Sequence, residues 1–366
     1  MERYFNTAGP NRAEFEYTLD PLSRFDLDDI LGYINQGKYF VLHAPRQTGK
    51  TSCMLALRDY LNAAGDYIAV YANVEGGQAS RNDVQSVIKS TVDTLALEID
   101  TIIDSSLAED LRDALQSVGR DSMLSIFLSK VSSLLPKPFV LILDEIDALV
   151  GDSLVSVLRQ IRSGYANRPK FFPQTIILCG VRDVRDYRIV LSNQDIVTGG
   201  SAFNIKAESL RLGNFTKEDI HELYLQHTHE TGQKFEEACF PLVWDATEGQ
   251  PWLVNALARE ATWSMKENRD RSVVITPEIM YRAQENLIYR RDTHIDILID
   301  KLKEPRVKRV LKLIIDENKN INEWQTITRE DFDYIEDLGV IVRNNASPLR
   351  VSNNIFKSII EAEYGN

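Results

Sequence analysis

The most informative stretch of the sequence is Ala44-Pro45-Arg46-Gln47-Thr48-Gly49-Lys50-Thr51-Ser52. An apolar run at residues 39–42 (Tyr-Phe-Val-Leu) comes before it, and a helix-forming run at residues 53–58 follows it. A strand, a tight loop and a helix start, with Gly-Lys-Thr at the junction, are typical of a phosphate-binding P-loop. We therefore expect the backbone N–H groups of residues 44–52 and the helix N-terminus to bind a polyphosphate.

Three residues of this stretch have separate expected roles. Gly49 lets the backbone approach an anion closely, and Lys50 adds a full charge that reaches the β- and γ-phosphates. The Thr51 hydroxyl is expected to bind Mg²⁺. The usual motif begins with glycine, whereas this chain has Ala44, which tolerates positive φ poorly, so we interpret the loop as a variant. The expected ligands are ATP or ADP with Mg²⁺.

A second apolar run, Phe-Val-Leu-Ile-Leu at residues 139–143, ends in Asp144 and Glu145. Such a run is typical of a strand buried on both faces of a parallel sheet, and ligands bind beyond the carboxyl ends of these strands. We expect Asp144 to hold Mg²⁺ through its water shell, and Glu145 to orient and deprotonate the attacking water. The alternative is a buried strand that ends in a solvated acidic turn.

The composition limits the class of protein. The chain has 366 residues, a hydrophobic content of 43% and a charged content of 26%, as in soluble globular proteins with two or three domains. Its net charge of −12 disfavours a large phosphate-binding surface but leaves room for a local basic patch. Cys53, Cys179 and Cys239 are expected to be small buried hydrophobes. Since the sequence shows no signal segment and no apolar run of membrane-spanning length, we expect a cytoplasmic protein with no membrane contact.

Residues 1–38 precede the first core strand. Tyr17, Leu19 and Arg24 are the side chains expected to cover the adenine of a bound nucleotide. Simple packing of this segment on the edge of the sheet is equally well supported.

A further strand is predicted at residues 174–180, and Arg182 stands just past its end. An arginine there can sense a third phosphate through a charge-assisted contact. A surface arginine in a run with Arg185 and Arg188 is an equally supported alternative. With strands also predicted at 66–74 and 203–210 and helices between them, residues 1–212 are expected to form an α/β domain with a parallel sheet between two helical layers.

Residues 213–291 are predicted to be a helical lid, with helices at about 217–231, 235–247, 252–267 and 277–290. A capping pattern at residues 216–219 starts the first helix. The sequence Gly249-Gln250-Pro251 separates the middle pair, as ordinary helix punctuation would. The favoured interpretation is that Pro251 and Trp252 also pack against the nucleotide base or ribose from a lid.

Residues 292–366 are predicted to form a winged helix-turn-helix domain, with three helices, two strands at about 340–343 and 348–351, and a last helix. The third helix of such folds often binds DNA. Here that helix, residues 329–337, is strongly acidic and would repel phosphates, so a protein-facing or intramolecular role is favoured. A basic cluster just upstream keeps nucleic-acid binding open, although a solvated helix face explains it too; it contains Lys301, Lys303, Arg306, Lys308, Arg309 and Lys312.

The order of these features resembles the AAA+-related ATPases of the STAND class, in particular the archaeal-type ATPase and "AAA-like domain" group. The motifs that carry the resemblance are residues 44–51, the sequence Leu-Asp-Glu-Ile-Asp at 143–147, and Gly-Gln-Pro at 249–251. The resemblance implies a P-loop NTPase fold of the three-layer αβα type (ASCE, AAA+-like), Mg²⁺-dependent ATP binding and slow hydrolysis. It also implies that Arg182 reads the γ-phosphate and that Pro251 lies near the nucleotide. No convincing arginine finger acting in trans is present, which argues against hydrolysis of the ring-assembly type.

We therefore expect an ATP-hydrolysing molecular switch in which Mg²⁺-ATP repositions the lid and the winged-helix domain. The expected partners are ATP and either a protein or a second copy of the chain. The alternative function is an ATP-dependent, DNA-binding initiator or a protein similar to a transposition regulator. A third hypothesis is a scaffold that holds a nucleotide with negligible turnover.

Overall fold

The computed structural model describes residues 2–183, 188–192, 194–290, 293–315, 326–344 and 347–364. The chain divides into two compact units. The first contains Met1–Asp20, Pro45–Gly49 and Gly213–Asn366, and the second contains Pro21–Ala44 and Lys50–Leu212. Among the described residues, none of the helices is long and apolar enough to cross a membrane.

The second unit is built on a parallel sheet of five strands in the order β2-β3-β4-β1-β7. Each strand pairs in parallel with its neighbours. The strands are β1 (Tyr39–His43), β2 (Ile68–Asn73), β3 (Phe139–Asp144), β4 (Thr175–Gly180) and β7 (Lys206–Arg211). The predicted parallel α/β sheet is therefore confirmed, and β4 lies between the strand before the P-loop and the strand that ends in Asp144.

Helices cover both faces of this sheet, as the continuous apolar strands require. All residues of β3 and β4 are buried. Phe40, Leu42 and Ile142 point to a core that includes α1 (Leu27–Asn35) and α2 (Lys50–Ala64). Val41 and Leu141 point to the opposite core, which includes three helices. These are α3 (Val84–Ile103), α5 (Met123–Leu134) and α6 (Gly151–Ser163). The three-layer arrangement is therefore as expected.

Smaller elements complete the second unit. A 3₁₀ turn at Pro21–Arg24 precedes α1, and α4 (Leu107–Ala114) packs on α3. An antiparallel hairpin of β5 (Arg188–Val190) and β6 (Ile196–Thr198) comes before the short helix α7 (Gly199–Ala202). Strands of three residues are too short to show an alternating pattern, so this hairpin is not predicted from the sequence.

The first unit contains residues 213–291, which the sequence predicts to be a lid, and the structure makes this segment helical. Its helices are α8 (Lys217–Thr231), α9 (Cys239–Thr247), α10 (Pro251–Arg259), a π-helical turn (Glu260–Ser264) and α11 (Pro277–Arg290). The predicted capping box at Thr216 is present. Helix α9 begins four residues later than expected because Phe235 forms a backbone bridge with Ile275 instead of a helical turn. The predicted helix at 252–267 is α10 followed by the π turn.

The remaining elements of this unit are consistent with a winged helix. They are α12 (Thr293–Leu302), α13 (Pro305–Ile315), α15 (Arg329–Asp337), the antiparallel strands β8 (Ile341–Asn344) and β9 (Ser347–Val351), and α16 (Asn354–Tyr364). The turn residues 345 and 346 lie outside the described part of the chain. Helix α15 is acidic as predicted, and two of its carboxylates, Asp333 and Glu336, pair with Arg343 of β8.

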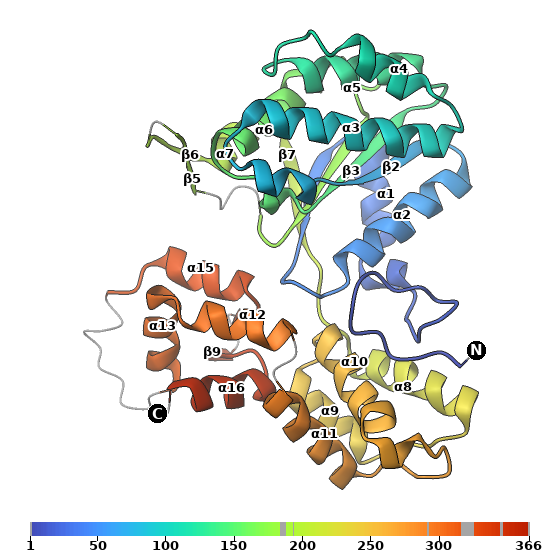
Figure 1. The fold of residues 1–366 in the computed structure, drawn as a ribbon, viewed down its shortest axis with the longest axis vertical. Helices are drawn as coiled ribbons and strands as arrows, with labels where there is room; N and C mark the ends of the chain where they lie inside the picture. Colours follow the sequence, from blue (N-terminus) through green and yellow to red (C-terminus); the bar gives the residue numbers. More distant parts are fainter. Residues whose placement is uncertain are drawn as a thin grey trace. The chain divides into compact units, whose positions relative to one another are not determined.

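The N-terminal segment of the first unit packs beside helices α8 and α10 (Figure 1). Tyr17 is fully buried, and its hydroxyl bonds to His227 of α8. The indole N–H of Trp252 donates to the carbonyl of Thr7. This segment is thus held by helices α8 and α10, which lie more than 200 residues away in the sequence. Its role as an adenine cover stays a prediction.

Candidate functional site

The carboxylate of Asp144 accepts three hydrogen bonds at the carboxyl edge of the sheet. It is fully buried at the end of β3. Its Oδ2 accepts hydrogen bonds from the Thr51 hydroxyl at 2.7 Å and from the Tyr71 hydroxyl at 2.8 Å. Its Oδ1 accepts from the backbone N–H of Glu145 at 2.8 Å. The first turn of α2, the end of β2 and the end of β3 therefore meet at one carboxylate.

Lys50 is the first residue of α2, and only 6% of its surface is exposed. Its ammonium donates to the carbonyl of Ala44 at 2.8 Å. The backbone N–H of Ala44 in turn donates to the carbonyl of Gly180 at the end of β4. A buried cation is thus held at a helix N-terminus, where the helix dipole also favours an anion.

The loop itself explains why alanine replaces the first glycine of the motif. The left-handed conformations fall at Gln47 (φ 59°) and Gly49 (φ 89°), and Ala44 is not among the positive-φ residues. Thr48 closes the loop by donating its hydroxyl to the carbonyl of Pro45. The position occupied by Ala44 therefore does not need the conformational freedom of glycine.

The other predicted ligand residues are placed as follows. Arg46 is exposed in the loop, and Ser52 is half-buried in the first turn of α2. Pro251 is the first residue of α10. Within the first unit, the preceding residue, Gln250, makes a long hydrogen bond of 3.5 Å from its amide to the carbonyl of Gln47.

Glu145 follows Asp144 in a left-handed conformation, with φ 57° and ψ 39°. For a residue with a Cβ atom this conformation costs about 1–2 kcal/mol. Strain of this kind collects at functional sites, where the surrounding structure holds the residue in place. The predicted general base is thus set at a sharp turn directly after the buried strand.

Arg182 lies two residues beyond the end of β4 and is half-buried. Because β4 runs between β1 and β3, this end of β4 faces the space between the P-loop strand and Asp144. The carboxylate of Asp147 accepts from the N–H of Val181 at 3.1 Å, which ties the segment before Arg182 to the turn after β3. Arg185 lies outside the described residues.

Two residues near Asp144 were missed by sequence reasoning. Burial and the neighbouring Asp144 charge raise the pKa of Tyr71 well above its usual value. Burial, followed by the same charge, raises the pKa of the Cys179 thiol. Both groups therefore stay protonated at neutral pH and surround the carboxylate with neutral polar atoms. The sequence alone does not place Tyr71 beside Asp144. That placement depends on the pairing of β2 with β3, in which Tyr71 lies opposite Ile142.

The donor set suits a magnesium ion that also binds phosphate. Mg²⁺ in nucleotide sites is held by one or two carboxylates or hydroxyls together with phosphate oxygens and water. The Thr51 hydroxyl and the Asp144 carboxylate already lie within 2.7 Å of each other. Among the described residues there is no cluster of three or more His, Cys, Asp or Glu side chains that would hold a metal without phosphate.

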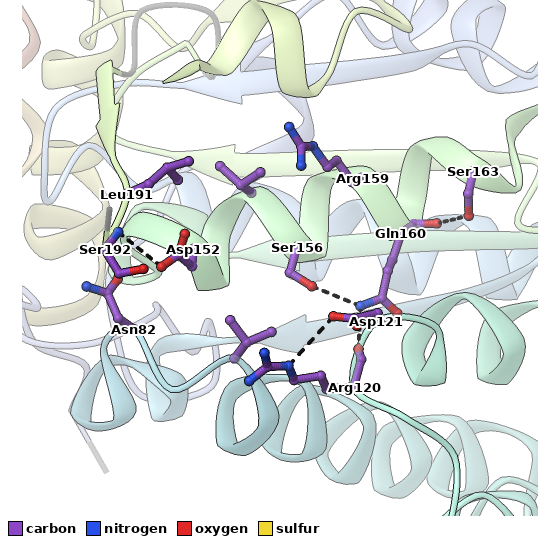
Figure 2. A pocket seen from close by; sticks show the side chains of 12 residues that line it. Asn82, Arg120, Asp121, Asp152, Ser156, Arg159, Gln160, Ser163, Leu191 and Ser192 are labelled. Carbon is purple, nitrogen blue, oxygen red and sulfur yellow. Dashed lines mark hydrogen bonds and ion pairs between the residues drawn. The ribbon is translucent and has the colours of Figure 1, made fainter. Parts of the chain in front are cut away.

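The second unit also has a polar cavity of about 640 Å³ at α6 (Figure 2). Its charges are balanced, because Arg120 and Arg159 line it together with Asp121 and Asp152. The amide of Gln160 donates to the carbonyl of Arg120, and its oxygen accepts two backbone N–H groups at the start of α5. None of the predicted nucleotide-site residues lines this cavity.

The fold and the site together define a P-loop ATPase in which an extra strand separates the P-loop strand from the acidic strand. A family model described as "AAA-like domain" matches residues 28–358. The chain therefore belongs to the AAA-like domain family of P-loop ATPases. A comparison with curated proteins finds no match.

A solved structure supports the same fold. The Walker-type ATPase paby2304 of Pyrococcus abyssi is 15% identical, with a TM-score of 0.65, and the alignment covers 98% of this chain and 99% of that one. Cdc6p from Pyrobaculum aerophilum is 16% identical, with a TM-score of 0.49 and coverage of 98% and 96%. At these identities the likeness to the Pyrococcus protein shows the fold alone, and the second score is too low to support an argument.

Proposed function

We propose that this AAA-like ATPase binds Mg²⁺-ATP at residues 44–52 and hydrolyses it slowly. The observation that carries the proposal is the hydrogen bond from Thr51 to the buried carboxylate of Asp144, with the Lys50 ammonium on the adjacent residue of the same helix. A hydroxyl, a carboxylate and a lysine in this order are the protein groups that P-loop enzymes use to hold a metal and two phosphates.

Each residue then has a defined task. Lys50 and the loop N–H groups bind the phosphates, and Thr51 and Asp144 hold the metal. When bound, Mg²⁺ would neutralise charge on the phosphate oxygens. Glu145 accepts the proton of the attacking water, Arg182 contacts the third phosphate, and Pro251 borders the nucleotide.

We further propose that the nucleotide state repositions the lid and the winged-helix elements, as in a switch of the STAND class. Charges within the C-terminal elements support an intramolecular role for the acidic helix. Arg343 pairs with Asp333 and Glu336. A guanidinium nitrogen of Arg309 lies 3.4 Å from a carboxylate oxygen of Asp331. These acids therefore already have partners within the C-terminal elements, which favours an intramolecular role.

ATP affinity and turnover in three variants test the enzymatic proposal. Lys50→Ala should weaken ATP binding at least tenfold. Glu145→Gln should bind ATP normally and lose about 10²–10⁴-fold in turnover, since only proton transfer is removed. Arg58→Ala is a suitable control, because Arg58 lies on α2 and pairs with its neighbour Asp59. Equal turnover in all of these proteins would falsify the catalytic assignment, and tightly held ADP without turnover would indicate a nucleotide-holding scaffold.

DNA binding is the alternative function, and the basic cluster on α12 and α13 is the observation that favours it. Several of its charges are already balanced: Lys301 and Arg306 pair with Glu304, and Lys303 pairs with Asp300. A salt titration of duplex binding separates the two functions, because phosphate contacts make affinity fall steeply with salt. Duplex binding at low salt that weakens in Lys308→Ala would support the DNA-binding hypothesis. No duplex binding at low salt would exclude that hypothesis.

A further inference from the structure

The first unit contains a pocket of about 400 Å³. Its lining includes residues of the N-terminal segment, α8, α10 and the π-helical turn. This volume lies within the range of pockets that hold small organic ligands. Its lining includes Arg3, Tyr17, His227, Arg259, Trp263 and Arg271. Residues 44–52, Asp144, Glu145, Arg182 and Pro251 do not line it.

The deep side of the pocket is aromatic and rigid. His227 is 2% exposed, and its ring contacts Phe5 and Tyr17. The amide nitrogen of Gln233 donates to the carbonyls of Asn268 and Val273, so its oxygen must accept from Nε2 of His227 at 2.9 Å. Nδ1 of His227 is therefore free to accept from the Tyr17 hydroxyl at 3.2 Å. This network fixes the tautomer of the imidazole and holds the rings that form the floor.

The rim of the pocket is cationic, although the whole chain carries a net charge of −12. Three arginines and one glutamate are its charged lining residues. Arg3 pairs with Glu230, and Arg271 pairs with Glu2. Arg259 is exposed and donates to the hydroxyl of Thr7 at 3.0 Å, with no carboxylate partner in the described part of the chain. One guanidinium at the rim is thus uncompensated.

Trp263 stands at the same rim and is 49% exposed. It belongs to the π-helical turn Glu260–Ser264, which continues α10 directly after Arg259. Arg269 holds the indole by stacking at 4.5 Å and by donating to the backbone carbonyl of Trp263. A half-exposed aromatic face is therefore fixed beside an uncompensated cation.

We infer that this pocket binds a small ligand with an aromatic body and one anionic group. The aromatic body lies between Trp263 and the ring floor, and the anion contacts Arg259. Such a ligand satisfies both unusual features of the rim, since an arginine bonds a carboxylate, sulfonate or phosphate oxygen strongly and an indole offers a stacking surface.

A matched pair of dyes tests this inference on the full chain. 8-Anilinonaphthalene-1-sulfonate is an aromatic anion, and N-phenyl-1-naphthylamine has the same aromatic body without the sulfonate. Fluorescence titration of the wild type should give one saturable site that binds the anionic dye at least tenfold more tightly than the neutral dye. Excess ATP should not displace the dye, because the pocket shares no residue with the predicted phosphate site.

Variants assign the two halves of the ligand. Arg259→Gln should remove the preference for the anionic dye, and Arg259→Lys should largely restore it. Trp263→Ala should weaken both dyes by a similar factor. Arg282→Gln is the matched control, because this exposed arginine of α11 pairs with Glu267 and does not line the pocket. Dye affinities that are the same in all four variants, or only weak unsaturable binding, would overturn the inference; thermal unfolding and ATP affinity of each variant verify that it is folded.

Discussion

The Thr51 hydroxyl donates a hydrogen bond of 2.7 Å to Oδ2 of Asp144, although 93 residues separate the two in the sequence. The bond joins the first turn of the helix after the P-loop to the end of the acidic strand. It places two oxygen atoms with affinity for Mg²⁺ beside each other on rigid elements of the second unit. Both oxygens should therefore act on the same metal ion.

The first prediction follows from this pair. Thr51→Ala and Asp144→Asn should each weaken ATP binding at least tenfold in the presence of Mg²⁺, because each removes one metal ligand or its charge. Binding in EDTA should change much less, since the loop and Lys50 remain. Thr51→Ser keeps the hydroxyl and should stay close to the wild type. A fluorescent ATP analogue titrated with and without Mg²⁺ measures this, and equal losses in both conditions would contradict the metal assignment.

Local motifs allowed much of the fold and of the site to be predicted. An apolar run followed by Asp144 is a local signal, because a strand buried on both faces must be apolar throughout. Tyr71 could not be found in this way. Its contact with Asp144 depends on β2 pairing with β3 in one register, and a shift of one residue would turn its side chain to the other face.

The second prediction concerns Tyr71. Its hydroxyl donates to Asp144 at 2.8 Å, and Tyr71→Phe would leave the buried carboxylate with one donor fewer. A hydrogen bond to a charged group contributes about 1.5–3 kcal/mol, so the free energy of unfolding should fall by about that amount. The Mg²⁺ concentration needed for half-maximal ATP binding should change, because the carboxylate loses a fixed orientation. Tyr67→Phe is the control, because Tyr67 directly precedes β2 and its hydroxyl donates to Asn35 instead of Asp144.

The N-terminal segment shows a different limit of sequence reasoning. The amide of Gln226 donates to the carbonyl of Thr18, and these residues are 208 positions apart. No local pattern reveals such a contact, since residues 1–20 have neither helical nor strand periodicity. The π turn is equally hidden, because residues 260–264 continue the apolar spacing of α10 and differ only in their backbone hydrogen bonding.

The third prediction uses the buried histidine. Burial is the main cause that lowers the pKa of His227 below its usual value; the Arg271 charge acts in the same direction, while the Gln233 hydrogen bond and the charges of Glu2 and Glu230 oppose it. Below about pH 6.5 the unfolded chain therefore binds a proton that the folded chain does not, and the folded state loses stability as the pH falls.

Unfolding at pH 7.5 and pH 5.5 measures this effect. The loss of stability between the two values should be smaller in His227→Gln than in the wild type, with a difference of at most about 1.4 kcal/mol, because pH 5.5 lies one unit below the unfolded pKa. His229→Gln, on an exposed position of the same helix, should behave as the wild type. An unchanged pH dependence in His227→Gln would show that the imidazole is not held neutral by the fold.

The fourth prediction concerns Gly249, which precedes Gln250 and Pro251. Its φ is +72°, and a Cβ atom added there would lie 2.0 Å from the carbonyl oxygen of Phe215. That oxygen belongs to backbone whose N–H donates to the carbonyl of Gly249 at 2.8 Å, so it cannot move without breaking a close backbone pairing. Gly249→Ala should therefore combine about 1–2 kcal/mol of left-handed strain with about 1–3 kcal/mol of overpacking.

Gly232 provides the matched comparison, because it has φ +79° at the end of α8 and an added Cβ would meet nothing within 4 Å. Gly232→Ala should show the strain alone. Denaturant unfolding followed by tryptophan fluorescence suits this test, since Trp252 and Trp263 lie in the same unit as both glycines. Because Gly249→Ala displaces the backbone that leads into Pro251, it should also weaken ATP binding more than Gly232→Ala does. Equal losses of stability in the two variants would mean that the Phe215 carbonyl yields, and that the close approach at Gly249 does not fix the start of α10.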